Sequence, residues 1–146
     1  MDFIKEIPSG IFIIISALIG AFFVVRNLRA SSFRDAAIKF RSVILEELKI
    51  VYPTVTTWPE HPPTFLANKF ISLQVAVIEF EAALPWYRRF GFRRAWRIYR
   101  VSDEPRSESS EQDYFQYLGA TIDDHYIDPR KRLRQNIDRL LKYTRT

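Results

Sequence analysis

The strongest hydrophobic pattern in the chain is an apolar run near its N-terminus. Residues 11–25, IFIIISALIGAFFVV, carry no charge, and residues 7–10 extend the uncharged stretch to nineteen. A helix of that length is ~28 Å long, about the thickness of the hydrocarbon core of a bilayer. Pro8 suits the first turn of this helix, where its missing N–H costs nothing. We therefore predict a single transmembrane anchor within residues 1–30, and its span includes Ile11, Phe12, Ile13, Leu18, Phe22, Phe23 and Val25.

A cleaved signal peptide and a buried helix of a soluble protein are the competing interpretations of this run. A signal peptide has a basic leader and a small-x-small cleavage site. Here residues 1–6 have a net charge of −1, and the run ends directly on Arg26 without such a site. These flanks favour an anchor that stays in the chain.

The charges on either side of the run predict its orientation. Arg26, Arg29 and Arg34 follow the run, whereas only Lys5 precedes it. The positive-inside rule then places the N-terminus outside and the remaining chain in the cytoplasm, at a bacterial-type inner membrane. Arg26 and Arg29 would lie at the lipid headgroups. A periplasmic location is the alternative, and the absence of cysteine does not distinguish the two.

After the anchor, apolar residues recur at helical spacing. This pattern predicts an all-α fold with a small bundle of four or five helices over residues 31–146. The first stripe, which we expect to face the core, consists of Phe33, Ala37, Phe40, Ile44, Leu48 and Val51. Because neither glycine nor proline occurs in residues 22–52, the anchor and this helix could form one rod. The alternative is a break at Ser31–Ser32, since Ser32 and Asp35 resemble a capping box.

The middle of the chain predicts a connector followed by a long helix. Residues 53–63, PTVTTWPEHPP, contain four prolines and are expected to be an extended connector. Thr64 is the expected cap of a helix over residues 65–84. One apolar seam of this helix is Leu66, Phe70, Leu73, Val77, Phe80 and Leu84, and a second is Ile71, Val75, Ile78 and Ala82. Two apolar faces predict a helix that is covered on both sides, at the centre of the bundle.

The C-terminal part of the chain predicts two further helices and a shorter one. Residues 86–101 are expected to be helical despite Gly91, and residues 102–112 are a polar, Ser-rich linker. Within residues 113–122, DYFQYLGATI predicts a short aromatic helix that stops near Gly119. Asp128 and Pro129 suit the start of the last helix. The buried stripe of that helix is predicted to be Leu133, Ile137, Leu140 and Leu141.

Charge is distributed in blocks along this half of the chain. Residues 85–100 contain six arginines and six aromatic residues without an acid, residues 102–128 have a net charge of −7, and the segment after Asp128 has +6. On a helical wheel, four arginines fall within ~80° of one another. They are Arg89, Arg93, Arg97 and Arg100, and roughly opposite them lie Tyr87, Phe92, Ala95, Trp96, Ile98 and Tyr99.

Four interpretations of this arginine face remain open. It could be a solvated face that pairs with the acidic segment, a contact with anionic lipid, a surface for an acidic protein partner, or a nucleic-acid surface. The sequence pI of about 9.6 invites the last one. However, the aromatic residues that base stacking would need lie on the face that the bundle should bury.

No motif in the chain predicts catalysis. Phosphate-binding glycine loops, nucleophile elbows and zinc-protease motifs are missing. Asp123, Asp124, His125 and Asp128 resemble a metal cluster, but Asp128 already suits a helix cap. We therefore predict a protein without enzymatic activity, cofactor or metal. Its expected role is that of an accessory subunit, scaffold or adaptor in a membrane complex, which contacts lipid and a protein partner. The alternative is a membrane-tethered nucleic-acid-binding protein.

Overall fold

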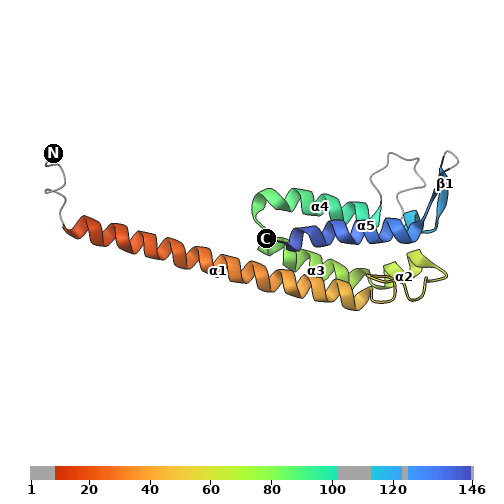
Figure 1. Cartoon of the computed structure of the whole chain (residues 1–146), viewed down its shortest axis with the longest axis horizontal. Coiled ribbons are helices and arrows are strands. Elements are labelled where there is room, and N and C mark those ends of the chain that lie inside the picture. The colour runs from red at the N-terminus through yellow and green to blue at the C-terminus, as the bar shows by residue number, and fades with distance from the viewer. Residues whose placement is uncertain (1–8, 102–112, 123–124, 146) are drawn as a thin grey trace.

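The computed structural model describes residues 9–101, 113–122 and 125–145. In that part of the chain the α-helices are α1 (Ser9–Glu47), α2 (Pro62–Asn68), α3 (Phe70–Ala83), α4 (Trp86–Arg100) and α5 (Pro129–Leu141). The shorter elements are the 3₁₀ turns η2 (Phe115–Tyr117) and η3 (Lys142–Thr144) and the strands β1 (Ala120–Ile122) and β2 (His125–Ile127). A long apolar N-terminal helix followed by a small helical bundle confirms the predicted fold class (Figure 1).

Helix α1 has two halves with different surroundings. The side chains from Ile13 to Ser32 are exposed, and no other described element lies beside this half of the helix in Figure 1. From Phe33 onward one face of the helix lies in the core. No break occurs at Ser31–Ser32, because α1 is continuous from Ser9 to Glu47; within it the Ser31 hydroxyl donates to the Leu28 carbonyl (3.3 Å). The single rod is therefore the correct alternative.

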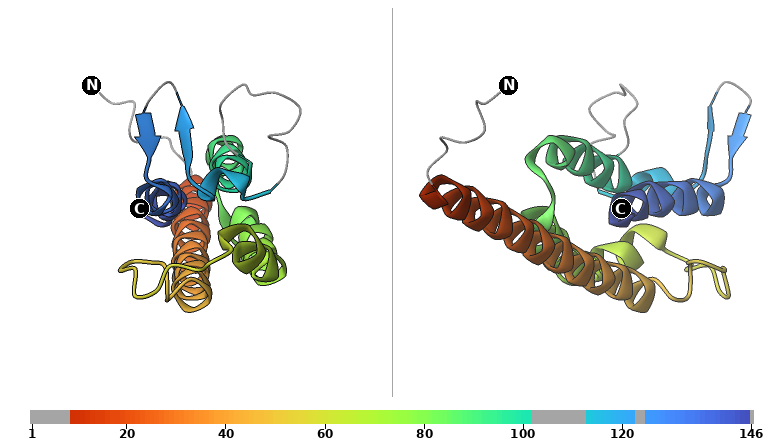
Figure 2. Two further views of the ribbon diagram at one scale, coloured as in Figure 1. Left: turned by 90° about the vertical axis from the view of Figure 1, so that its right-hand side faces the viewer. Right: turned by 60° about the vertical axis from the view of Figure 1, so that its left-hand side comes forward.

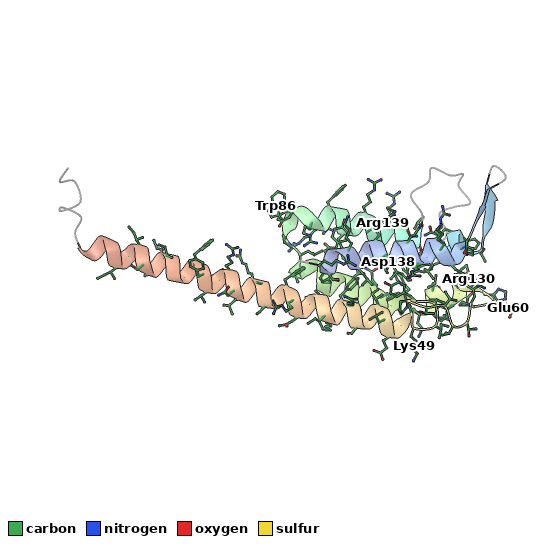
Figure 3. The ribbon with its side chains drawn as sticks, viewed as in Figure 1. Lys49, Glu60, Trp86, Arg130, Asp138 and Arg139 are labelled. Atoms are coloured by element: carbon green, nitrogen blue, oxygen red, sulfur yellow. The ribbon has the colours of Figure 1, made fainter. Side chains whose placement is uncertain are left out.

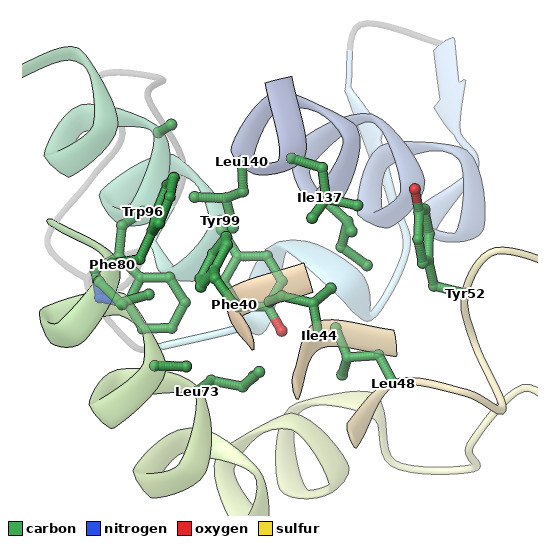
Figure 4. Packing of buried hydrophobic residues seen from close by; sticks show 14 of the residues in the cluster. Phe40, Ile44, Leu48, Tyr52, Leu73, Phe80, Trp96, Tyr99, Ile137 and Leu140 are labelled. Carbon is green, nitrogen blue, oxygen red and sulfur yellow. The ribbon is translucent and has the colours of Figure 1, made fainter. Parts of the chain in front are cut away.

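The core lies where α1, α3, α4 and α5 meet. The predicted stripe of α1 is buried, except for Phe33, which is half-buried at the end of the bundle. Phe40 of α1 stacks on Phe80 of α3 with a centroid distance of 4.8 Å, and Phe92 of α4 packs edge-on against both rings (Figure 4). Figure 2 shows α3, α4 and α5 arranged around the second half of α1. Each buried side chain of this size contributes ~1.5–3 kcal/mol to folding.

The predicted helix over residues 65–84 differs from the structure in two ways. It starts earlier, because Pro62 and Pro63 take the first positions of α2, so Thr64 is not its cap. Lys69 then separates α2 from α3, and its N–H donates to the Leu66 carbonyl (3.1 Å) three residues back. The connector is therefore shorter than predicted.

The predicted central position of this helix is wrong. Its first seam is buried or half-buried, as expected. Its second seam is exposed: Ile71 by 75%, Val75 by 51% and Ile78 by 58%. The physical reason is that α3 lies at the edge of the bundle, where α1 covers one of its faces and no described element covers the other.

The C-terminal elements agree largely with the sequence. Asp128 caps α5 by accepting a hydrogen bond from the N–H of Arg130 (2.9 Å), and the predicted stripe of α5 is buried. The expected aromatic helix is the single turn η2, which ends before Gly119 with its φ of 84°. A hairpin that the sequence analysis did not predict follows, with Ala120 opposite Ile127 and Ile122 opposite His125. The linker 102–112 lies outside the described residues.

Candidate functional site

Helix α4 presents the arginine face, and its opposite face is anchored in the core. Phe92, Ala95, Trp96, Ile98 and Tyr99 are buried, as predicted. The indole N–H of Trp96 donates to the side-chain oxygen of Gln74 on α3 (3.0 Å). This anchoring fixes the direction in which the arginines point. Tyr87 was assigned to the buried face, but it is 67% exposed, because the first turn of α4 extends beyond the core.

Arg89 is turned toward α3. Its Nε donates to the carbonyl of Leu84 (2.9 Å) and its Nη2 to the carbonyl of Ala82 (3.0 Å). These are carbonyls at the C-terminal end of α3, where a helix leaves backbone acceptors without partners. Arg89 therefore closes the end of α3, and its guanidinium is already committed to the protein itself.

Arg93 pairs with an acid from the neighbouring helix. Its Nε donates to Glu81 Oε1 (2.8 Å), and its Nη2 contacts the same oxygen. The hydrogen bond to Glu81 raises the pKa of Arg93, so the cation is retained. The Arg93 side chain is exposed, and solvent screens an ion pair at such a site, so the pair contributes little to stability. An acidic ligand can therefore compete with Glu81 for it.

Arg100 pairs with the acidic segment, as the intramolecular interpretation expects. Its Nε donates to Asp113 Oδ2 (3.2 Å), and its guanidinium lies 4.8 Å from the centre of the Phe70 ring. Both partners belong to this chain. Arg100, the last arginine of the predicted face, therefore already has partners. It lies at the end of α4 that is farthest from the apolar half of α1.

Arg97 is the most available cation of the predicted face. It is exposed and has no ion-pair partner within residues 9–101, 113–122 and 125–145. It lines a shallow groove together with Phe90, Arg93 and Arg94. The groove therefore combines three guanidinium groups with one exposed aromatic ring. Arg26 and Arg29, the other predicted contact residues, are exposed on α1 outside the bundle.

The sequence analysis missed the first turn of α4. Trp86 is 82% exposed and Phe90 is 79% exposed, and with Tyr87 they form an apolar patch. Arg88, in the same turn, connects α4 to α1 and to η3. Its guanidinium lies 5.9 Å from the centre of the Phe33 ring and 5.8 Å from the centre of the Tyr143 ring. It also donates a hydrogen bond to the Tyr143 carbonyl (3.2 Å). The sequence did contain a signal that Trp86 and Phe90 are exposed. On the helical wheel they lie beside the arginines rather than opposite them.

A cluster of buried tyrosines, Tyr99, Tyr114 and Tyr117, lies on the buried side of α4. The Tyr117 hydroxyl donates to the Tyr99 carbonyl (2.7 Å) and accepts from the Asn136 amide (3.0 Å). Burial raises the pKa of Tyr99, Tyr114 and Tyr117. These groups are neutral and enclosed, so they serve packing rather than chemistry at a surface.

The described residues of α4 form contact surfaces. Among the residues that the structure describes, no three His, Asp or Glu side chains are placed to hold a metal ion; Asp123 and Asp124 lie outside those residues. What remains is a cationic groove beside an apolar patch, suited to an anionic or amphipathic surface. The chain matches no family model, no curated protein and no solved structure.

Proposed function

We propose that this chain is a non-catalytic, membrane-tethered scaffold or adaptor that binds an acidic protein partner through the arginine face of α4. The observation that carries the proposal is the division of α1. Its first half is apolar and exposed, and its second half is built into the bundle core. A long exposed apolar surface needs a nonaqueous environment. The helix is long and apolar enough to cross a membrane, by length and composition.

The charges beside the apolar half support an N-out, C-in arrangement at a bacterial-type inner membrane. Arg26 and Arg29 are exposed on α1 between the apolar half and the bundle, and Arg34 is exposed at the start of the bundle. Cations at this position favour the cytoplasmic side, where they contact anionic headgroups. The bundle, with its arginine face, would then stand on the cytoplasmic surface.

The availability of Arg97 and the exposed Arg93–Glu81 pair supports the protein-partner role. Arginine and aromatic residues are enriched among the side chains that dominate binding energy at protein interfaces. In the nucleic-acid alternative, Phe92, Trp96 and Tyr99 are buried and cannot stack on bases, so stacking would depend on the exposed Trp86, Tyr87 and Phe90.

The tether is tested by a matched pair of arginine substitutions. Leu18→Arg places a charge in the apolar half, at a cost of ~2.5–3.5 kcal/mol in the centre of a membrane helix. Leu28→Arg makes the same change beyond Arg26, where the cost should vanish; the two leucines are similarly exposed on α1. We expect Leu18→Arg to lower the share of the chain that resists alkaline carbonate extraction of membranes, and Leu28→Arg to leave it unchanged. Complete extraction of the unmodified chain would refute the tether.

The partner surface is tested by charge reversal. Arg93→Glu/Arg97→Glu should abolish co-purification of a protein partner from detergent-solubilised membranes. Lys131→Glu/Arg134→Glu on the exposed side of α5 makes the same change in net charge and is the control. Helical circular dichroism confirms that each variant is folded. If nuclease-sensitive nucleic acid is lost instead of a protein, the nucleic-acid alternative is correct.

A further inference from the structure

The first turn of α4 carries a compact aromatic patch. Trp86, Tyr87 and Phe90 lie within ~100° of one another around the helix, because positions i, i+1 and i+4 share one side. All three are exposed by two thirds or more, although large aromatic side chains are normally buried. Among the described residues, these rings make no ring contact with the core aromatic cluster, and the ring contact of Trp86 is with Tyr87, edge to face at 6.0 Å.

This patch lies at the end of the bundle from which the apolar half of α1 emerges. Phe33 is the first residue of α1 that packs on the bundle, and its ring contacts both Phe80 and the guanidinium of Arg88. The first turn of α4 is therefore level with that exit point. Figure 3 shows Trp86 at this end, directed away from the bundle and on the side of the apolar half of α1.

The distance along α1 from the membrane surface to the bundle is slightly greater than the thickness of a headgroup layer. From Arg26, the first charge after the apolar run, to Phe33 the helix rises ~10 Å. The headgroup layer on one side of a bilayer measures ~5–8 Å. A transmembrane helix is tilted by ~20° on average, and a tilt of α1 toward α4 lowers the first turn of α4 to the surface.

The charge at this end fits an anionic surface. The segments at this end of the bundle are 26–35, 84–90 and 143–145. Together they contain six arginines and one acidic residue, Asp35. Tryptophan and tyrosine prefer the interface between hydrocarbon and water, and arginine contacts anionic headgroups there. An apolar patch at any other end of the bundle would fit a protein as well as a membrane. At the exit of α1, lipid is the surface within reach.

We infer that Trp86, Tyr87 and Phe90 insert into the lipid interface and form a second membrane contact of this chain. The inference rests on the proposed function, because it requires α1 to cross the bilayer. The contact fixes the bundle at two points, the exit of α1 and the start of α4. It therefore holds the bundle against the membrane, with the arginines of α4 at increasing distances from the headgroups along the helix.

Spin labels on single cysteines test this contact, and the natural chain has no cysteine to remove. The full chain is placed in vesicles of phosphatidylcholine and phosphatidylglycerol, with a label at Trp86→Cys or Phe90→Cys. Each of these variants retains two of the three aromatic residues. Ile71→Cys is the matched control, since Ile71 is equally exposed but lies at the opposite end of α3. Leu18→Cys reports on the apolar half of α1.

The measurement compares collisions of the label with oxygen, which concentrates in lipid, and with a water-soluble nickel chelate. We expect the oxygen-to-nickel ratio at positions 86 and 90 to exceed that at position 71 several-fold, and position 18 to show the highest ratio. Equal, low ratios at positions 86, 90 and 71 with a high ratio at position 18 would overturn the second contact and leave the tether intact. A low ratio at position 18 would overturn the tether itself.

Discussion

At the scale of single residues, the buried tyrosines differ in whether their hydroxyl groups have partners. Tyr117 both donates and accepts a hydrogen bond. The hydroxyl groups of Tyr99 and Tyr114 are buried and have no hydrogen-bond partner in the part of the chain that the structure describes. A buried polar group without a partner has lost its hydration and gained nothing in return. The three side chains should therefore respond differently to loss of the oxygen atom.

We predict that Tyr99→Phe and Tyr117→Phe change stability in opposite directions. Tyr99→Phe removes an unpaired oxygen and should raise the free energy of unfolding by about 1 kcal/mol, whereas Tyr117→Phe leaves the Asn136 amide without its acceptor and should lower it by ~1–3 kcal/mol. Denaturant unfolding of the full chain in detergent, followed by near-ultraviolet circular dichroism, measures both. Equal destabilisation by the two variants would show that the Tyr99 hydroxyl has a partner.

Single residues also mark the limit of what the sequence could predict about the arginine face. Wheel positions placed Arg89, Arg93, Arg97 and Arg100 on one side of a helix. They could not show that Arg89 bonds to the end of α3, because that contact depends on the turn at Leu84 and Pro85. Nor could they show that Glu81 and Asp113 occupy two of the others. Partner choice in a folded protein is set by tertiary geometry, which periodicity does not contain.

At the scale of elements, helical periodicity predicted most of the bundle. The stripes of α5, of the bundle half of α1 and, apart from Tyr87, of α4 were assigned correctly, because each of these segments has one main apolar face that the bundle buries. Helix α3 has two, and the pattern could not tell which of them a neighbour covers. The hairpin β1–β2 was missed because three-residue strands leave too little alternation to recognise.

The two seams of α3 should differ sharply in their contribution to stability. Leu73 is fully buried on the inner seam, and Ile71 is exposed on the outer one. We expect Leu73→Ala to lower the free energy of unfolding by ~2–5 kcal/mol and Ile71→Ala to change it by no more than ~0.5 kcal/mol. Thermal unfolding of the purified chain compares them. A large loss in Ile71→Ala would mean that the outer seam is covered in solution.

At the scale of the whole molecule, α5 is joined to the rest of the bundle through neutral tyrosines. The Tyr52 hydroxyl donates to Asp138 on α5 (2.7 Å), and burial together with this bond raises the pKa of Tyr52 to about 12. Tyr99, Tyr114 and Tyr117 lie between α4, η2 and α5, and burial raises their pKa values too. The native bundle therefore requires these hydroxyl groups in the protonated form.

This requirement predicts unfolding in alkali. In the unfolded chain tyrosine has a pKa of ~10, so above that pH the folded state holds more protons than the unfolded state. The stability from these tyrosines is complete below pH ~10 and falls as the pH rises further. The tyrosinate absorbance that comes from Tyr52, Tyr99, Tyr114 and Tyr117 should rise in the same transition in which helical circular dichroism is lost. Ionisation of every tyrosine with helicity retained would contradict the prediction.

The unbroken course of α1 has a further consequence for the chain. Because Ser9 to Glu47 form one helix, no flexible joint separates its apolar half from the bundle. Adding one residue between Arg29 and Phe33 would rotate the bundle by ~100° about the helix axis and move it ~1.5 Å outward. The direction that α4 faces is therefore set by the number of residues in α1 between its apolar half and the bundle. A single insertion or deletion there would turn the bundle about the helix axis without altering any of its internal contacts.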